Sequence, residues 1–279
     1  RARTARTSLG IQAGRDAEAA GRCGADEVKR YPECGAYHLF GKKYAELLSA
    51  EDITAEPRAT TGSVENLKLL ADDTSGIDVA FVQGGVGDPE QYPNLVTLAA
   101  LYYEPVWVFY RDDREFTRLS QLAGKHIAVG PEGSGSRALA QNLINASAMA
   151  PGTFRLSPLT GAPAAKALTE GRVDAIFMVA APDAPMIQRL LHAENVKLMN
   201  LGHAEALAKR FPYLSTVRLP RGVVDLKADL PSSNVTLLAT TAYLVARGDF
   251  HPALVSVLLQ AAVKVHGKPG FFHKAGEFP

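Results

Sequence analysis

The stretch KHIAVGPEGSGSRALAQNLI, residues 125–144, joins a short β-branched strand to a helix through a glycine-rich turn. The pattern predicts the strand at His126 to Val129, the turn at Gly130 to Gly135 and the helix from Ser136. Such a unit directs backbone N–H groups and the positive end of the helix at one point, where a small anion can bind. The stretch therefore indicates an α/β fold. Anion binding and a tight turn with ordinary capping serines are about equally favoured by the sequence alone.

The glycine turn matches none of the familiar nucleotide or nucleophile motifs. A Walker A loop needs a lysine before its final serine, whereas here Arg137 follows Ser136. A dinucleotide fingerprint needs a third glycine, which is missing at the required spacing after Gly135. A nucleophile elbow needs glycines two residues on either side of a serine, and this turn has none so placed. What is left for binding is a set of backbone amides with the hydroxyls of Ser134 and Ser136.

The rest of the chain alternates short β-like runs with amphipathic helices, the pattern of an α/β fold with a largely parallel sheet. Residues 77–81 (IDVAF) and 173–177 (VDAIF) each follow a helix and a glycine, so they fit two lobes built on similar βαβ units. The apolar run 95–110 is interrupted by Glu104-Pro105, which favours an edge or a crossing point over a central strand. Strands are expected at 53–60, 77–83, 95–110, 126–129, 173–179 and 235–247, and helices at 41–49, from 63, from 136, at 164–168 and at 252–266.

A second loop also places hydroxyl groups and a glycine between a strand and a helix start. It reads Thr61-Gly62-Ser63, with Ser63 as the expected helix cap and Asn66 one turn later. A plain cap is the simpler interpretation of this loop taken alone. Two such helix starts in two successive βα units are, however, what a ligand clamped between two lobes would need.

Two further polar side chains are candidates for ligand binding. Gln83 ends an expected strand and precedes two glycines, at the carboxyl edge where α/β folds bind ligands. A glutamine that caps the loop is the alternative. Tyr37 lies in the glycine-containing turn CGAYHLF, which favours a pocket position, whereas Tyr102, Tyr103 and Trp107 lie in apolar runs typical of a core.

Composition argues against several classes of function. The 279 residues are 47% hydrophobic and 21% charged with a net charge of +1, which gives no electrostatic argument for nucleic-acid binding. The longest apolar stretches are too short to cross a membrane. No paired carboxylates, positioned histidine or Cys/His cluster indicate catalysis, so we expect no enzyme activity, no catalytic residues, no cofactor and no metal site.

Residues 1–34 form the atypical part of the chain. They are rich in Arg, Ala and Gly, lack a recognisable strand and lack the apolar core of a signal peptide. We therefore expect a poorly ordered or foreign segment. Cys23 and Cys34 both lie in it, and the sequence leaves open whether they form one disulfide or two free thiols.

Several segments, taken together, cover residues 35–185 and extend to about residue 265: GAYHLFGKKYAELL, TTGSVENLKLL, IDVAFVQGG, LYYEPVWVFYR, LSQLAGKHIAVGPEGSGSRALAQNLI, ALTEGRVDAIFMVAAPDAP, NVTLLATTAYLVAR and HPALVSVLLQAA. In this order they resemble the TAXI family of solute-binding proteins, which serve tripartite ATP-independent periplasmic (TRAP) transporters. The chain departs from the family at three points: the polar segment GADEVKRYPE stands where the family has a hydrophobic first strand, Cys34 replaces a glycine, and His38 stands where a second tyrosine is common.

The resemblance implies a type II periplasmic-binding fold, with two α/β lobes joined by a hinge and a ligand cleft between them. Lobe 1 would comprise residues 35–110 and 228–279, and lobe 2 residues 111–227. Known ligands of the family are small organic anions, such as glutamate-like amino acids and dicarboxylates. Carried over residue by residue, the expected ligand contacts are Tyr37, Thr61, Gly62, Ser63, Asn66, Gln83, Ser134, Gly135 and Ser136.

The resemblance also implies a monomeric receptor in the periplasm or another extracytoplasmic compartment, which closes on its ligand and delivers it to a TRAP-type membrane permease. A subgroup with the GPEGSG loop continues toward a C-terminal membrane anchor, which raises the expectation that residues 1–279 are the ectodomain of an anchored protein. Two alternatives share the fold: a ligand-sensing domain of a signalling protein, and an enzyme for a small substrate.

Overall fold

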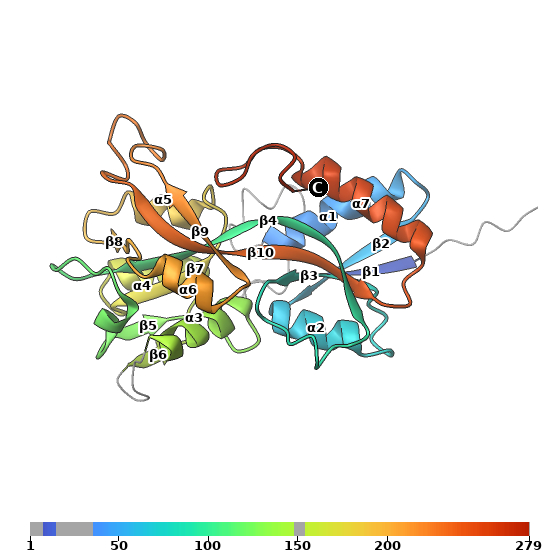
Figure 1. Ribbon diagram of the computed structural model, residues 1–279, viewed down its shortest axis with the longest axis horizontal. Helices are drawn as coiled ribbons and strands as arrows, with labels where there is room; N and C mark the ends of the chain where they lie inside the picture. The colour runs from blue at the N-terminus through green and yellow to red at the C-terminus, as the bar shows by residue number, and fades with distance from the viewer. Residues whose placement is uncertain (1–7, 15–35, 148–153, 279) are drawn as a thin grey trace, which may run out of the picture. The chain divides into compact units, whose positions relative to one another are not determined.

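The computed structural model describes residues 8–14, 36–147 and 154–278, and Figure 1 shows their secondary structure. The chain separates into two compact units. Unit 1 comprises residues 1–102 and 242–279, and unit 2 comprises residues 103–241. The family resemblance implies boundaries at residues 110 and 227. Each unit is a mixed α/β structure with its own part of the sheet, and each is described by itself.

The sheet of unit 1 contains three parallel strands and one antiparallel strand, in the order β2-β1-β3-β10. Strand β1 (Ser8–Gly14) pairs in parallel with β2 (Thr54–Thr60) on one side and with β3 (Val79–Gln83) on the other. Strand β10 (Val235–Arg247) returns from unit 2, and its residues 242–246 pair antiparallel with β3. The strands predicted at 53–60 and 77–83 are therefore confirmed as β2 and β3 of one sheet, with β1 between them.

Strand β1 was not anticipated, and the expectation that residues 1–34 contain no strand is wrong for residues 8–14. The segment SLGIQAG has only two large apolar residues, Leu9 and Ile11, so its local signal for a strand is weak. Its backbone pairs with β2 from Ser8 opposite Thr54 onward, a tertiary contact that local pattern does not reveal. The expectations about residues 1–7 and 15–34, and about both cysteines, fall outside the described residues.

The sheet of unit 1 is covered by helices on both faces, as Figure 1 shows. Helices α1 (Ala36–Ser49) and α7 (Pro252–His266) pack on one face against Val79 and Phe81 of β3. Helix α2 (Ser63–Ala71) packs on the other face, against Ala80 and Val82 of the same strand. Because successive side chains of a strand point to opposite faces, the continuous apolar sequence of β3 gives a strand buried on both sides.

The sheet of unit 2 is built on strand β4 (Leu95–Tyr110), which enters from unit 1. Residues 106–110 of β4 pair antiparallel with β7 (Ala175–Val179), and β7 pairs in parallel with β5 (His126–Ala128). Strand β4 is continuous and passes from unit 1 to unit 2 at residues 102–103, next to the Glu104-Pro105 pair that favoured an edge or a crossing point. Pro105 precedes the segment paired with β7, so its missing N–H does not interrupt that ladder.

Shorter elements complete unit 2. Strand β9 (Leu214–Leu219) pairs antiparallel with the first half of β10, β8 (Lys197–Leu198) pairs with the end of β4, and β6 (Arg155–Ser157) pairs in parallel with β5. The helices are the 3-10 helix η2 (Leu119–Leu122), α3 (Gly135–Ala146), α4 (Gly161–Thr169), α5 (Pro185–Leu191) and α6 (Ala204–Arg210). The strands and helices of unit 2 enclose an apolar core that includes Ile127, Leu139 and Phe177.

Candidate functional site

The glycine turn between β5 and α3 is a tight loop shaped by two glycines. Gly130 and Gly133 have φ angles of 93° and 83°, in the left-handed region that side chains disfavour. A Cβ atom on Gly130 would lie 3.0 Å from Oγ of Ser134, so the turn folds closely onto the start of the helix. The Gly130 N–H donates to the carbonyl of Leu159 at 3.1 Å, which ties the turn to the edge of the sheet.

The serines of this turn have different roles. Ser134 is the N-cap of α3: its Oγ accepts from the N–H of Arg137 at 3.2 Å, and its hydroxyl donates to the carbonyl of Pro131 at 2.8 Å. The helix then begins at Gly135, which is buried. Ser136 is half-buried, and its hydroxyl and backbone N–H have no hydrogen-bond partner within the described residues. Ser136 is therefore the serine of this loop best placed to donate to a ligand.

The sequence motifs do not identify Arg137 as a site residue, but the structure places its side chain at this turn. The Nη1 atom of Arg137 donates to the carbonyl of Gly130 at 3.2 Å, and the side chain is only 19% exposed. Its ion pair is long, with Nη2 3.9 Å from Oε1 of Glu132, a side chain that is 92% exposed. A mostly covered guanidinium with unused N–H groups can bind a carboxylate or another oxyanion in a bidentate manner.

In unit 1 the predicted site residues of the second loop form one polar cluster that joins α2 to β3. Asn66 is fully buried, its Nδ2 donates to the carbonyl of Phe81 at 2.8 Å, and its Oδ1 accepts from the hydroxyl of Thr60. Ser63 is also buried, and its Oγ accepts from the N–H of Gln83 at 2.9 Å. The structure thus brings Ser63, Asn66 and Gln83 together, and their polar groups brace the helix against the strand.

The start of α2 differs from the prediction in one respect. The N-cap is Gly62 and not Ser63, and Gly62 has a φ of 137°, which favours glycine. The helix therefore begins one residue earlier than expected, at Ser63, and the Ser63 hydroxyl contacts β3 instead of capping the helix. The side chain that binds the loop is Glu65, whose Oε2 accepts from the backbone N–H and the hydroxyl of Thr61, each at 2.6 Å. This carboxylate was not among the predicted site residues.

Two of the four candidate aromatic side chains, Tyr37 and Trp107, are buried in the cores. Tyr37 is 8% exposed and stacks on Phe81, with ring centroids 5.6 Å apart, so it packs beside the polar cluster of unit 1. Trp107 is fully buried in unit 2 and donates from Nε1 to the carbonyl of Ala180 at 2.9 Å. The prediction that Trp107 is a core residue is confirmed.

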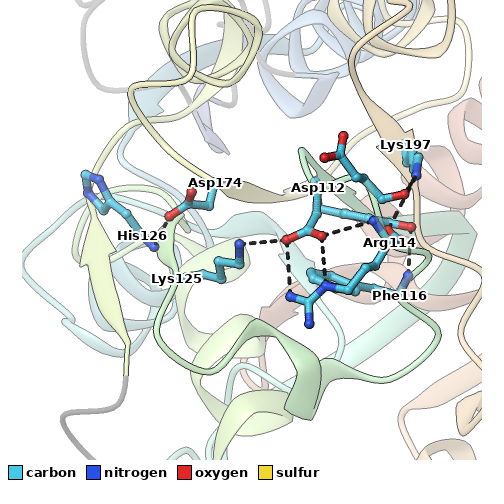
Figure 2. A network of polar contacts seen from close by, with 9 residues as sticks. Asp112, Arg114, Phe116, Lys125, His126, Asp174 and Lys197 are labelled. Atoms are coloured by element: carbon cyan, nitrogen blue, oxygen red, sulfur yellow. Dashed lines mark hydrogen bonds and ion pairs between the residues drawn. The ribbon is translucent and has the colours of Figure 1, made fainter.

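A separate network of charges in unit 2 braces the turn that follows β4 (Figure 2). Asp112 accepts hydrogen bonds from Arg114 at 3.1 Å and from Lys125 at 2.8 Å. These hydrogen bonds, that of Arg114 first, hold the pKa of Asp112 below its usual range. Nearby, Asp174 accepts from the N–H of His126 at 2.7 Å, and Lys197 donates to the carbonyl of Asp113 at 2.6 Å. These carboxylates and amines are engaged with the protein itself, so the network is structural.

Comparison with known proteins identifies a family and a fold. A model described as the NMT1-like family matches residues 32–263. Among solved structures, the periplasmic aliphatic sulphonate binding protein SsuA from Escherichia coli is similar, with a TM-score of 0.53 and 14% identity over 93% of this chain and 74% of that one. The effector-binding domain of QuiR in complex with shikimate gives a TM-score of 0.54 and 12% identity, over 95% of this chain and 99% of that one.

A third similar structure is a histidine kinase sensor domain with similarity to periplasmic binding proteins. Its TM-score is 0.54 at 14% identity, with 94% of this chain and 92% of that chain covered. At these identities the likeness shows the fold alone, which is a periplasmic-binding-protein-like α/β fold. Within the described ranges, no helix is both long and apolar enough to cross a membrane.

Proposed function

The chain belongs to the NMT1-like family, and from this premise we propose that it is an extracytoplasmic solute-binding receptor for a small organic anion. In this proposal the receptor delivers its ligand to a membrane permease of the TRAP type, as the TAXI-like motifs of the sequence suggest. The family and the fold support a ligand-binding protein. The anionic nature of the ligand and the TRAP-type permease as the partner go beyond the family and the fold, and both are proposed.

The observation that supports an anionic ligand is the arrangement of polar groups at the start of α3. Ser136 offers a hydroxyl and a backbone N–H, and the guanidinium of Arg137 is held next to them by the carbonyl of Gly130. Burial of a charge is costly unless a partner compensates it, and the 3.9 Å pair with the exposed Glu132 compensates Arg137 only weakly. An anionic ligand would complete the environment of this guanidinium. Similar proteins whose names include an aliphatic sulphonate or shikimate support a ligand of this class.

Thermal denaturation with a panel of amino acids, dicarboxylates and sulfonates tests the proposal. A bound anion should raise the free energy of unfolding by about 2.7 kcal/mol at a hundredfold excess over its Kd. Arg137→Gln and Ser136→Ala should reduce this stabilisation, whereas Arg210→Gln, an exposed arginine of α6 in the same unit, should not. A panel in which no anion stabilises the wild-type protein refutes the proposal.

A signalling role is the second candidate, because one of the similar structures is the sensor domain of a histidine kinase. The ligand chemistry would be the same, and only the partner would differ. Uptake of the identified ligand by membranes that contain the permease separates the two functions: a transport receptor is required for uptake, and a sensor is not. We propose binding without chemical change, so mass spectrometry should recover the ligand unaltered from the denatured protein.

A further inference from the structure

The glycine turn of unit 2 carries two charges of opposite sign. In residues 130–137 the ionisable side chains are Glu132 and Arg137. The guanidinium is 19% exposed, and its Nη1 atom donates to the carbonyl of Gly130 at 3.2 Å. Glu132 is 92% exposed, and within the described residues its one polar contact is the 3.9 Å approach of Oε1 to Nη2 of Arg137. The fold therefore holds the cation in place, whereas the carboxylate is held only by charge.

The distance between these two side chains leaves the guanidinium open to a ligand. A charge-assisted hydrogen bond between a guanidinium N–H and a carboxylate is about 2.7–2.9 Å long, and the pair of Glu132 with Arg137 is well beyond that length. The N–H groups of Nη2 can thus donate to an oxyanion of the ligand. An oxyanion at hydrogen-bond distance from Nη2 would lie beside the Glu132 carboxylate, which has the same sign of charge.

We infer that Glu132 is a specificity-determining residue, which competes with the ligand for Arg137 and disfavours phosphate esters relative to carboxylates and sulfonates. The repulsion from Glu132 grows with the charge of the head group that binds Arg137. A phosphate monoester carries a charge of about −1.5 to −2 at pH 7, whereas a carboxylate or a sulfonate carries a single negative charge. The inference rests on the proposed function, because it narrows the class of anion that the start of α3 accepts.

Coulomb's law gives the size of the effect. Two unit charges about 4 Å apart in water change a binding constant about fivefold. The value for water applies because the Glu132 carboxylate is almost fully exposed. Glu132→Gln should therefore raise the affinity about fivefold for a singly charged head group and about 25-fold for a doubly charged one. The ratio of the two affinities should shift about fivefold toward the phosphate ester.

Propanesulfonate and propyl phosphate test the inference, because they share a carbon chain and differ in the charge of the head group. Calorimetric titration at about pH 7.5 and low salt gives both affinities for the wild-type protein and for Glu132→Gln. Glu205→Gln is the matched control: Glu205 is an exposed acid of α6 in the same unit, and its substitution should leave both affinities unchanged. At about pH 5 the phosphate ester has lost most of its second charge, so Glu132→Gln should shift the ratio much less.

The variant is suited to this test because it removes a charge and little else. Within the described residues Glu132 makes no hydrogen bond, so glutamine should leave the thermal unfolding of the protein without ligand unchanged. Unfolding curves of the wild-type protein and of both variants, recorded before the titrations, check this. A change in affinity then reports the lost charge at the turn.

The possible outcomes separate the inference from the function. If both probes bind but Glu132→Gln shifts their ratio by less than about twofold, the inference is overturned and the receptor function stands. The same holds if propyl phosphate binds neither protein while propanesulfonate binds both, because another feature then excludes the phosphate. If neither probe binds the wild-type protein, the tightest acid of the thermal panel replaces them: a gain of about fivefold in Glu132→Gln supports the inference, and an unchanged affinity overturns it. If no acid of the panel binds, the proposed function fails and the inference fails with it.

Discussion

Replacement of Asn66 by alanine should destabilise unit 1 strongly, because Asn66 is the centre of the bracing between α2 and β3. Its side chain is fully buried and joins two other buried groups, the carbonyl of Phe81 and the hydroxyl of Thr60. Alanine removes both contacts and adds no replacement. A buried polar group that loses its partner keeps the full desolvation penalty, about 1–3 kcal/mol. With two such groups, Asn66→Ala should lower the free energy of unfolding by about 3 kcal/mol.

Urea denaturation measures this loss, and the position of the single tryptophan makes the assay selective. Trp107 is buried in unit 2, so its fluorescence follows unit 2, whereas far-ultraviolet circular dichroism follows both units. The variant should lose stability in the circular dichroism transition more than in the fluorescence transition. Asn94→Ala, at an exposed asparagine of unit 1, should change stability by no more than about 0.5 kcal/mol.

A double-mutant cycle with Thr60→Val gives the coupling between the two side chains. Because the Thr60 hydroxyl donates to Asn66, the two substitutions should be non-additive by about 0.5–3 kcal/mol. A loss below about 1 kcal/mol for Asn66→Ala, or strict additivity with Thr60→Val, would refute the bracing role. Asn66 would then be free to act as a ligand residue alone.

Two other predictions concern stability. Burial, followed by the charges of Lys43 and His273, lowers the pKa of His266 from 6.5 to about 4. The unfolded chain therefore binds the proton first, so stability is full above pH 6.5 and falls by about 3 kcal/mol as the pH approaches 4. The free energy of unfolding, measured as a function of pH, should fall with this slope in the wild-type protein and in the control His203→Gln, which changes an exposed histidine. The slope should be smaller in His266→Gln, and equal slopes in the three proteins would contradict the prediction. Gly130→Ala should cost about 1–2 kcal/mol in urea denaturation, because the φ of 93° disfavours a Cβ; an unchanged midpoint would contradict this.

The sequence predicted the elements whose signal is local. The amphipathic pattern of α7, the apolar runs of β3 and β10, and the strand–turn–helix unit around Gly130 all appear in the structure. The α/β fold class is confirmed by the structure and by its likeness to periplasmic-binding-protein folds. Each of these elements has its periodicity or its turn residues within a single segment, which is the information that a single sequence contains.

What the sequence did not reveal depends on contacts between distant segments. Strand β1 exists through its pairing with β2, more than forty residues later. Ser63 and Asn66 were predicted as ligand donors, but whether a donor is available depends on its partners at Gln83 and Phe81. The roles of Glu65 and Arg137 were missed for the same reason: their identities are visible in the sequence, whereas their hydrogen bonds are not. The narrower assignment to the TAXI family stays a prediction.

The most direct test of the central claim is to identify what the purified protein retains. The protein is incubated with a mixture of small organic acids, freed of unbound compounds and denatured, and the released compound is identified by mass spectrometry. We predict that wild-type protein retains an acid with a carboxylate or similar oxyanion, and that Arg137→Gln retains much less of it. Wild-type protein that retains no acid, or an Arg137→Gln variant that retains as much as wild type, would contradict the account.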